Sequence, residues 1–485
     1  MNQNHRKCRS IVLVGGWGNY FLAFARRCVA NGIAVYHLDT GDGSEAWRGR
    51  SACLAGGATM DFTLIGTPQG LSVIHDYARS VRADALIAIF YDEKLAWLAR
   101  NRAWLEPEFK LLLPSEETLH TLASKIAQIR HASESGFDVL PTRYLSTPAD
   151  AREIPADWFP LILRPDNPFL VEPIFRVQLV HTSGDLQAFM ERLVTVAAPV
   201  IAQPFRKLPN LLVHGVRSED GEIPRLEAFL GRRRYRGYLH SLERTEFPPG
   251  VERACRAFAE STNLTGCFHF DLLLSERERR AYYLEVNVRL GGTTDKVTRL
   301  GFDEPLLIMA MYELLSLAEV ERAAPRRWQR VANKRASLGL ILTALRGRLT
   351  EMDYPSSSWQ SLWQSVQELL LYRDSTFDWQ DLRGTMTNYL RPVTVTALER
   401  GGAEAGGNQQ AACPPFSPKD PPKTYSGLGT GTQAGANASC DPPALPLLHH
   451  SSESEGESSS RGPSHARNYR DERGPAVDSQ YLEQA

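Results

Sequence analysis

Residues 267–289, CFHFDLLLSERERRAYYLEVNVR, decide how the central part of the chain folds. Two apolar runs, Cys267–Leu274 and Ala281–Arg289, flank the charged segment Ser275–Arg280. Apolar runs of this length, separated by a short polar segment, are typical of two antiparallel strands joined by a turn. The segment therefore predicts a β-hairpin with a largely buried body and an exposed turn.

Polar side chains gather at the open end of this hairpin. Folding the chain about its turn places Asp271 opposite Leu284 or Glu285. Side chains two residues apart in a strand share a face, so Glu285, Asn287 and Arg289 point the same way. We therefore expect two carboxylates, one amide and one guanidinium to converge.

This group of side chains has the chemistry of a metal and phosphate site. Mg²⁺ is bound by oxygen ligands, usually a few carboxylates together with substrate phosphates, and Asp271, Glu285 and Asn287 supply such a set. Arg289 would bind a phosphate or carboxylate in a bidentate geometry that lysine cannot copy. The competing interpretation is a half-exposed strand with solvated polar residues. His269 is interpreted as a packing or hydrogen-bonding residue in preference to a metal ligand.

The first hundred or so residues alternate between short apolar runs and helical periodicity. Gly15, Gly16 and Gly18 form a turn between the first strand and a helix over Tyr20–Asn31. Such alternation favours a parallel sheet with helices on both faces, so we expect a doubly wound α/β domain over residues 1–114. The expected strands are Ile11–Val14, Ile33–Leu38, Ala85–Phe90 and Lys110–Leu113.

The pattern changes to α+β from about residue 115. We expect one long helix over Glu117–Ser135, helices over Ser183–Leu193 and Val251–Asn263, and a two-lobed domain ending near residue 318. The expected strands besides the hairpin are Phe159–Arg164, Val177–His181, Val200–Phe205, Leu211–Val216 and Leu226–Arg234.

The C-terminal part is expected to be helical and then disordered. Residues 319–395 are interpreted as a helical extension whose core uses the tryptophans Trp328, Trp359, Trp363 and Trp379. Residues 396–485 are rich in Gly, Ser, Pro, Asn and Gln, and cannot bury enough apolar area to offset the entropy of ordering. They are predicted to form a disordered tail.

Composition narrows the class of protein. The 485 residues carry 55 Lys and Arg against 56 Asp and Glu, a net charge of −1 that disfavours a dedicated nucleic-acid binder. The sequence contains no run of 18 apolar residues, so no membrane-spanning helix is predicted. The seven cysteines form no CxxC pair, which indicates reduced thiols and a cytoplasmic protein. Glycines interrupt the apolar stretch after Arg9, so a secretory signal is disfavoured.

With these motifs in hand, the chain resembles the ATP-grasp superfamily from about Ile11 to Leu317. LEVNVR at 284–289, preceded by Phe270-Asp271, is similar to that family's metal-binding hairpin. Lys125 resembles the lysine that opens the nucleotide-binding region, FPLILRP at 159–165 resembles its P-x-x-x-K-P strand, and VIAQPF at 200–205 resembles its adenine hinge. FLGRRRYRG at 229–237 is similar to the ATP-dependent carboxylate–amine ligases, which include D-aspartate ligase-like proteins.

The resemblance implies an ATP-dependent enzyme that joins a small-molecule carboxylate to an amine, such as an amino acid, through an acylphosphate. It implies ATP and Mg²⁺, or Mn²⁺ in its place, as cofactors. Lys125, Arg164 and Gln203 would bind the nucleotide, Asp271, Glu285 and Asn287 the metal, and Arg289 would stabilise the acylphosphate. Nucleic acid and membrane partners are not implied, and a homodimer is left open because relatives commonly pair.

Departures from the family pattern keep a second function open. Arg164 stands where the family usually has lysine, Pro204 replaces an acidic hinge residue, and Asn210 replaces an acidic residue that holds ribose. A catalytically impaired nucleotide-binding protein is the alternative.

Two further motifs are weaker. GGWG at 15–18 with Asp39 faintly resembles a dinucleotide fingerprint, but Phe21 stands where the third glycine belongs, so a tight strand-to-helix turn is favoured. The basic run Arg232, Arg233, Arg234 and Arg236 is interpreted as a solvated strand end, with binding of an anionic substrate as the alternative.

Overall fold

The computed structural model describes residues 9–40, 51–89, 92–235, 237–324 and 327–390, which all belong to the same structural unit. The expected disordered tail lies outside these residues. The described cysteines Cys28, Cys53, Cys255 and Cys267 are free thiols, as their spacing predicts. No helix in the described ranges is both long enough and apolar enough to cross a bilayer.

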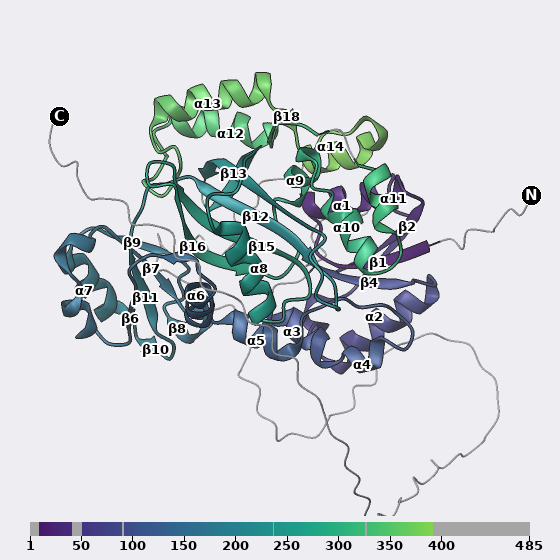
Figure 1. The fold of residues 1–485 in the computed structure, drawn as a ribbon, viewed down its shortest axis with the longest axis horizontal. Coiled ribbons are helices and arrows are strands. Elements are labelled where there is room, and N and C mark those ends of the chain that lie inside the picture. The colour runs from purple at the N-terminus through teal and green to yellow at the C-terminus, as the bar shows by residue number, and fades with distance from the viewer. Residues whose placement is uncertain (1–8, 41–50, 90–91, 236, 325–326, 391–485) are drawn as a thin grey trace, which may run out of the picture. The chain divides into compact units, whose positions relative to one another are not determined.

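The N-terminal part is a parallel sheet with strand order β3-β2-β1-β4 (Figure 1). Three of its strands match the expected runs, while β3 was missed. The fourth expected strand, Lys110–Leu113, is wrong, because Lys110 makes only an isolated bridge to Ala85. The elements are β1 Arg9–Gly15, α1 Asn19–Val29, β2 Ile33–Asp39, β3 Gly56–Thr59, α2 Pro68–Ser80, β4 Ala85–Ile89, α3 Asp92–Arg100 and α4 Arg102–Leu105.

The glycines after β1 have a packing role. Gly15 has φ +147°, and a Cβ there would lie 2.4 Å from the carbonyl oxygen of Ile89 in the neighbouring strand β4. Trp17 is buried in the same turn, with its ring 4.8 Å from that of Phe21 and 5.9 Å from that of His37. The segment therefore fits the interpretation as a tight turn, packed by its own tryptophan.

The predicted helix over Glu117–Ser135 is wrong in one respect. The chain forms two helices, α5 Glu116–Ala123 and α6 Lys125–Glu134, because Ser124 adopts extended backbone at ψ 118°. The Ser124 hydroxyl accepts a hydrogen bond from the backbone N–H of Ala127, so it caps the second helix. Helical periodicity continues across such a break, which is why the sequence pattern did not reveal it.

A small antiparallel sheet with order β6-β11-β7-β9 forms the next lobe. Its core joins Leu161 and Leu163 of β7 to Leu186 and Met190 of a covering helix. The elements are β6 Arg143–Leu145, β7 Leu161–Pro165, β8 Val171–Glu172, β9 Gln178–Val180, α7 Ser183–Arg192, β10 Thr195–Val196 and β11 Val200–Pro204.

The largest sheet has the order β18-β17-β14-β13-β12-β15-β16-β5 and contains the predicted hairpin as β15 and β16. Helix α8 lies across β12 and β15 (Figure 1), where Phe258 packs edge-on against Phe270. The elements are β5 Asp138–Val139, β12 Asn210–Arg217, β13 Arg225–Tyr235, β14 Tyr238–Arg244, α8 Val251–Ser261, β15 Gly266–Ser275, β16 Arg280–Asn287, β17 Arg330–Ala332 and β18 Arg373–Asp374.

The C-terminal helices are present, but two strands among them were not expected. β17 pairs with β14, and β18 pairs with β17, so this segment extends the large sheet. The helices are α9 Thr294–Leu300, α10 Glu304–Met311, α11 Leu317–Arg322, α12 Lys334–Leu345, α13 Ser358–Leu371 and α14 Leu382–Leu390.

The expected tryptophan core of this segment is wrong. Trp359, Trp363 and Trp379 are exposed, at 75%, 57% and 73% of their surface, and only Trp328 packs against a core. Tryptophan is usually buried because of its large apolar surface, but the helices here turn other residues inward.

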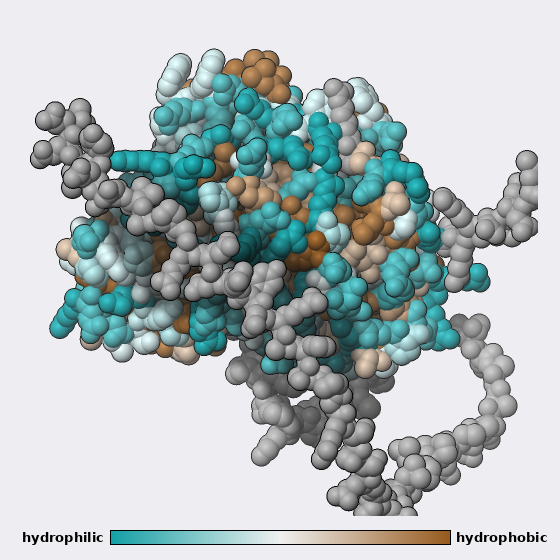
Figure 2. Space-filling model, in the orientation of Figure 1, coloured by the Kyte–Doolittle hydropathy of each residue, from teal (hydrophilic) through white to brown (hydrophobic). Residues whose placement is uncertain are grey.

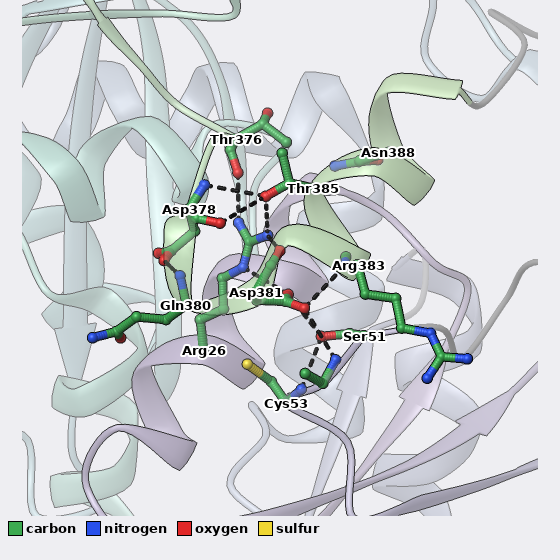
Figure 3. A network of polar contacts seen from close by, with 12 residues as sticks. Arg26, Ser51, Cys53, Thr376, Asp378, Gln380, Asp381, Arg383, Thr385 and Asn388 are labelled. Atoms are coloured by element: carbon green, nitrogen blue, oxygen red, sulfur yellow. Dashed lines mark hydrogen bonds and ion pairs between the residues drawn. The ribbon is translucent and has the colours of Figure 1, made fainter.

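The C-terminal segment from Thr376 to Thr385 is hydrogen-bonded to helix α1 and to Ser51 and Ala52, which precede β3 (Figure 3). Arg26 of α1 donates hydrogen bonds to the Asp381 carboxylate at 3.0 Å and to the carbonyl oxygen of Thr376 at 2.6 Å. Asp381 also accepts hydrogen bonds from the Ser51 hydroxyl and the Ala52 N–H. The two ends of the described chain are thus held together by one buried carboxylate.

Candidate functional site

The hairpin places its polar residues as the sequence predicts. Asp271 of β15 lies opposite Glu285 of β16, and a register shift follows directly after this pair. The Asn287 side chain donates a hydrogen bond to Asp271 Oδ2 at 3.1 Å, and Arg289 lies 3.4 Å from Asn287 Oδ1. Four side chains therefore meet where the hairpin leaves the large sheet, with Arg289 two residues beyond the end of β16.

The two carboxylates repel each other. Burial and, to a lesser degree, the charge of Glu285 together raise the pKa of Asp271 to about 8, although Arg289 and the Asn287 hydrogen bond oppose the shift. A pair of partly buried carboxylates facing one another is stabilised by a cation between them. The donor set thus fits Mg²⁺ or Mn²⁺, with the Asn287 amide turned so that its oxygen faces the ion.

Metal binding here would depend on oxygen ligands from the substrate as well. No group of three or more His, Cys, Asp or Glu side chains in the described part of the chain is arranged to hold an ion. Two carboxylates and one amide form an open site, which is typical of Mg²⁺ bound together with phosphates and not of a closed protein cage.

Arg164 and Gln203 lie on adjacent strands β7 and β11 and face the hairpin. The Arg164 guanidinium donates to Gln203 Oε1 at 2.9 Å and contacts the carbonyl oxygen of Leu284 at 3.4 Å. Burial lowers the pKa of Arg164, while the charge of Glu285 opposes this shift. The structure therefore joins two residues that lie 39 positions apart in the sequence, and Arg164 contacts the hairpin directly.

Lys125 is the first residue of helix α6, which is hydrogen-bonded both to the residue after β7 and to strand β16. The Asp166 carboxylate, just after β7, accepts hydrogen bonds from Ser124 and from the N–H of Ile126. Three residues into the helix, Gln128 accepts a hydrogen bond from the N–H of Val286 in β16. Lys125 is thus half-buried where the small sheet approaches the hairpin.

A buried histidine pair supports the hairpin, and the sequence did not reveal it. His214 of β12 stacks on His269 with ring centroids 5.0 Å apart, and its Nδ1 lies 3.0 Å from Glu304. Burial lowers the pKa of His269 well below its usual range, with contributions from His214 and Arg289. His269 Nε2 lies 3.9 Å from Asp271 Oδ2, a separation that supports packing beside the carboxylate. Only the pairing of β12 with β15 brings the histidines together.

Arg289 also lines a small, mostly apolar cavity between the N-terminal sheet and the hairpin. Its walls include Ala88 and Pro114 on one side and Cys267 and Leu290 on the other. A cation at the edge of an apolar cavity suits a molecule with one anionic end.

The basic run divides between structural roles. Arg233 is buried and donates to Glu368 of α13 at 3.1 Å, and Arg234 donates to Asn210 Oδ1 at 2.6 Å. Arg232 pairs with Glu243 at 3.2 Å. The expectation of a solvated strand end is wrong for Arg233 and Arg234, because helix α13 and the segment around Met352 cover them. Arg236 lies outside the described residues.

No family model and no curated protein matches the chain, but solved structures do. It aligns with N5-carboxyaminoimidazole ribonucleotide synthetase in its ADP complex at a TM-score of 0.51 and 14% identity, covering 70% of this chain and 85% of that one. It aligns with L-amino acid ligase from Bacillus licheniformis at a TM-score of 0.50 and 13% identity, covering 65% and 77%.

A biotin carboxylase–ATP complex from Campylobacter jejuni aligns at a TM-score of 0.50 and 13% identity, covering 64% of this chain and 72% of that one. At such identities the likeness is one of fold. The chain therefore shares the fold of these solved enzymes over about two thirds of its length.

Proposed function

We propose that the protein is an ATP-dependent carboxylate–amine ligase. One observation carries the proposal: Asp271 and Glu285 lie opposite each other beside Asn287 and Arg289 at the end of a buried hairpin. Arg164 faces this group from the small sheet. Solved proteins of the same fold are described as an ADP complex, an ATP complex and an L-amino acid ligase, which supports the assignment.

The reaction has two steps. A carboxylate oxygen of the acid attacks the γ-phosphorus of ATP, the bond to the β–γ bridging oxygen breaks, and ADP leaves. The amine nitrogen then attacks the acyl carbon, phosphate leaves with the electron pair of the C–O bond, and the nitrogen loses a proton. The first step replaces a poor leaving group, hydroxide, with phosphate. Phosphoryl transfer of this kind depends chiefly on positioning and charge stabilisation.

We assign the residues the roles that the resemblance implies. Lys125 and Arg164 bind phosphate oxygens, and Gln203 holds the nucleotide from the hinge strand. Asp271, Glu285 and Asn287 would hold Mg²⁺ or Mn²⁺, which would supply positive charge to neutralise the phosphates. Arg289, with its five donors, holds the acylphosphate and the oxyanion that follows. The apolar cavity beside Arg289 fits the body of the acid.

The finer features follow the resemblance. Residues 1–114 help to bind the acceptor, residues 115–318 carry the nucleotide and metal, residues 319–395 form an extension, and residues 396–485 a tail. A D-aspartate ligase-like specificity for an amino acid, acting in the cytoplasm, is the narrowest form of the proposal.

A nucleotide-binding protein without turnover is the second candidate. Arg164 stands in place of the usual lysine and already contacts Gln203 and Leu284. Asn210, where an acidic residue would hold ribose, accepts a hydrogen bond from Arg234. Side chains already paired within the protein have fewer donors left for a nucleotide.

Product analysis tests the proposal. The full chain is incubated with Mg-ATP and pools of amino acids and small carboxylic acids, with Glu285→Ala as the inactive variant and Glu276→Ala, in the exposed turn of the same hairpin, as the matched control. We expect ADP and phosphate that depend on the pool, equal in wild type and Glu276→Ala and lost in Glu285→Ala.

Other products would change the assignment. AMP and pyrophosphate would indicate adenylation and contradict the acylphosphate route. Saturable ATP binding without turnover in an extended acceptor pool would favour the second candidate.

A further inference from the structure

Helix α13 is amphipathic with its polar side turned inward. Its buried residues are Ser361, Ser365 and Glu368, which surround the guanidinium of Arg233 at 2.6, 2.7 and 3.1 Å. Glu368 also accepts a hydrogen bond from Ser337 of α12 at 2.6 Å. The face that packs against the protein is therefore satisfied by hydrogen bonds and one ion pair.

The opposite side of α13 is an exposed apolar stripe. Trp359, Trp363, Val366 and Leu370 follow one another at spacings of four, three and four residues, and each is exposed by 40% or more. This spacing keeps the four side chains on one face of a helix and matches the seam by which helices pack against each other. A surface helix of a monomeric protein normally turns such a stripe toward its core.

Helix α12 repeats this arrangement beside it. Leu338, Leu342 and Leu345 have spacings of four and three, and all are more than half exposed. Lys334 at the start of α12 donates to the carbonyl oxygen of Leu369 near the end of α13, so the two helices run antiparallel in contact. Figure 2 shows a brown, apolar cluster at one end of α13.

We infer that the antiparallel helix pair α12 and α13 is the contact by which two copies of the chain associate. Two antiparallel helices with outward stripes are half of a four-helix bundle, and a second copy related by a two-fold axis supplies the other half. The exposed apolar side chains of the two helices amount to an area on the order of 800 Å² per copy, the size of a typical stable interface. The inference is independent of the catalytic proposal.

The charges of α13 favour a second copy over a membrane. Ser358–Leu371 contains no Lys or Arg, and its only charged residue, Glu368, is buried. A two-fold contact sets a helix against its own copy, so a neutral exposed face brings no like charges together. Helices that lie on membranes carry Lys and Arg beside the apolar face. Gln360, Gln364 and Gln367 stand beside the stripe of α13 instead. The basic residues of α12, Lys334 and Arg335, donate hydrogen bonds to backbone carbonyl oxygens within the protein.

Sedimentation velocity on the full chain tests the contact. We expect the wild type to change from monomer to dimer with rising concentration. The double variant Trp363→Glu/Leu370→Glu should raise the dimer dissociation constant at least about 100-fold, because it buries charge in the apolar seam. Gln360→Glu, exposed on the same helix outside the stripe, should stay within about threefold of wild type.

A second variant pair keeps the test decisive. Leu338→Glu/Leu342→Glu alters the neighbouring helix and should weaken the dimer to a similar degree, with circular dichroism showing that both variants are folded. A wild-type chain that stays monomeric at about 100 μM would overturn the inference, and so would a dimer that survives both double substitutions. A monomer whose exposed tryptophans are protected from an aqueous quencher would instead assign the stripe to another segment of this chain.

Discussion

At the scale of single residues, the site depends on charges that the fold holds close together. Asp271 has a pKa raised to about 8 because it is buried beside Glu285, and Arg289 compensates only in part. Mutual repulsion of this kind prepares a site for a cation and costs stability without one. The same geometry therefore predicts both a loss of activity and a gain in stability when one carboxylate is neutralised.

Asp271→Asn should lose activity and gain stability. We expect turnover to fall at least about 100-fold, while the metal-free protein melts at a higher temperature at pH 8 than the wild type. A carboxyl with a raised folded pKa favours the native state below that pKa and loses the advantage as pH rises from about 4 to about 8. The gain in melting temperature should therefore disappear at pH 4. An equal gain at both pH values would contradict the role of this charge pair.

His240 gives a pH dependence of opposite sign. Burial lowers the pKa of His240 to about 3, with Lys296 and Arg233 adding to the shift. Below about pH 6.5 His240 is protonated in the unfolded chain but stays neutral in the native state, so the free energy of unfolding falls as the pH is lowered. We expect this residue to account for a loss on the order of 1 to 2 kcal/mol between pH 7.5 and pH 5.

Denaturant unfolding at the two pH values measures this effect. The variant His240→Asn should lose less stability on acidification than the wild type, while His120→Asn, altered on an exposed helix face, should behave like the wild type. Identical pH dependence in all three proteins would refute the prediction.

At the scale of elements, α13 is held by its buried polar face. Arg233 and Glu368 are 1% and 0% exposed, so neither charge can turn to water when its partner is lost. Burial lowers the pKa of Arg233, although Glu368 opposes the shift. Such pairs add little net stability, but breaking one leaves an uncompensated charge in the interior.

Glu368→Gln is therefore expected to destabilise the fold by about 3 to 5 kcal/mol. Chemical denaturation followed by far-ultraviolet circular dichroism measures the change. The control is Glu313→Gln, which removes a similar charge from an exposed ion pair with Lys110 and should leave the denaturation midpoint where it is. Equal midpoints for both variants would show that α13 is not held by this pair.

At the scale of the whole described unit, the C-terminal segment stabilises the N-terminal sheet. Asp381 is 1% exposed and accepts hydrogen bonds from Arg26, Ser51, Ala52 and Gly384. Although burial alone would raise it, these hydrogen bonds lower the pKa of Asp381 overall. Arg26 and the ionised carboxylate of Asp381 are thus in contact although they lie 355 positions apart in the sequence.

Asp381→Ala should loosen this connection. We expect a lower melting temperature and faster proteolytic cleavage on the C-terminal side of β18, since four hydrogen-bond donors lose their acceptor. Limited proteolysis followed by mass spectrometry locates the cut. Gln380→Ala, which alters an exposed side chain next to the same network, is the control and should be cleaved at nearly the wild-type rate. Unchanged cleavage of Asp381→Ala would show that the connection is held elsewhere.

Prediction from the sequence succeeded where a pattern is local. The runs Ile11–Val14, Ile33–Leu38 and Leu211–Val216 became strands, and the hairpin formed with Asp271 opposite one of its two expected partners. Prediction failed where the local pattern does not match the structure. Ser124 separates two helices although the helical periodicity of the sequence continues across it. Lys110 begins an apolar run that makes one bridge and no strand.

The sequence by itself determined the hairpin, its polar residues and the ATP-grasp resemblance, because side chains two apart on a strand share a face whatever the rest of the chain does. Only the tertiary structure decided that Arg164 meets Gln203 and Leu284, that His214 stacks on His269, and that α13 turns serines inward and tryptophans outward. These outcomes join residues up to 135 positions apart. They follow from which charges and volumes meet when the sheets assemble, and no short period in the sequence records that.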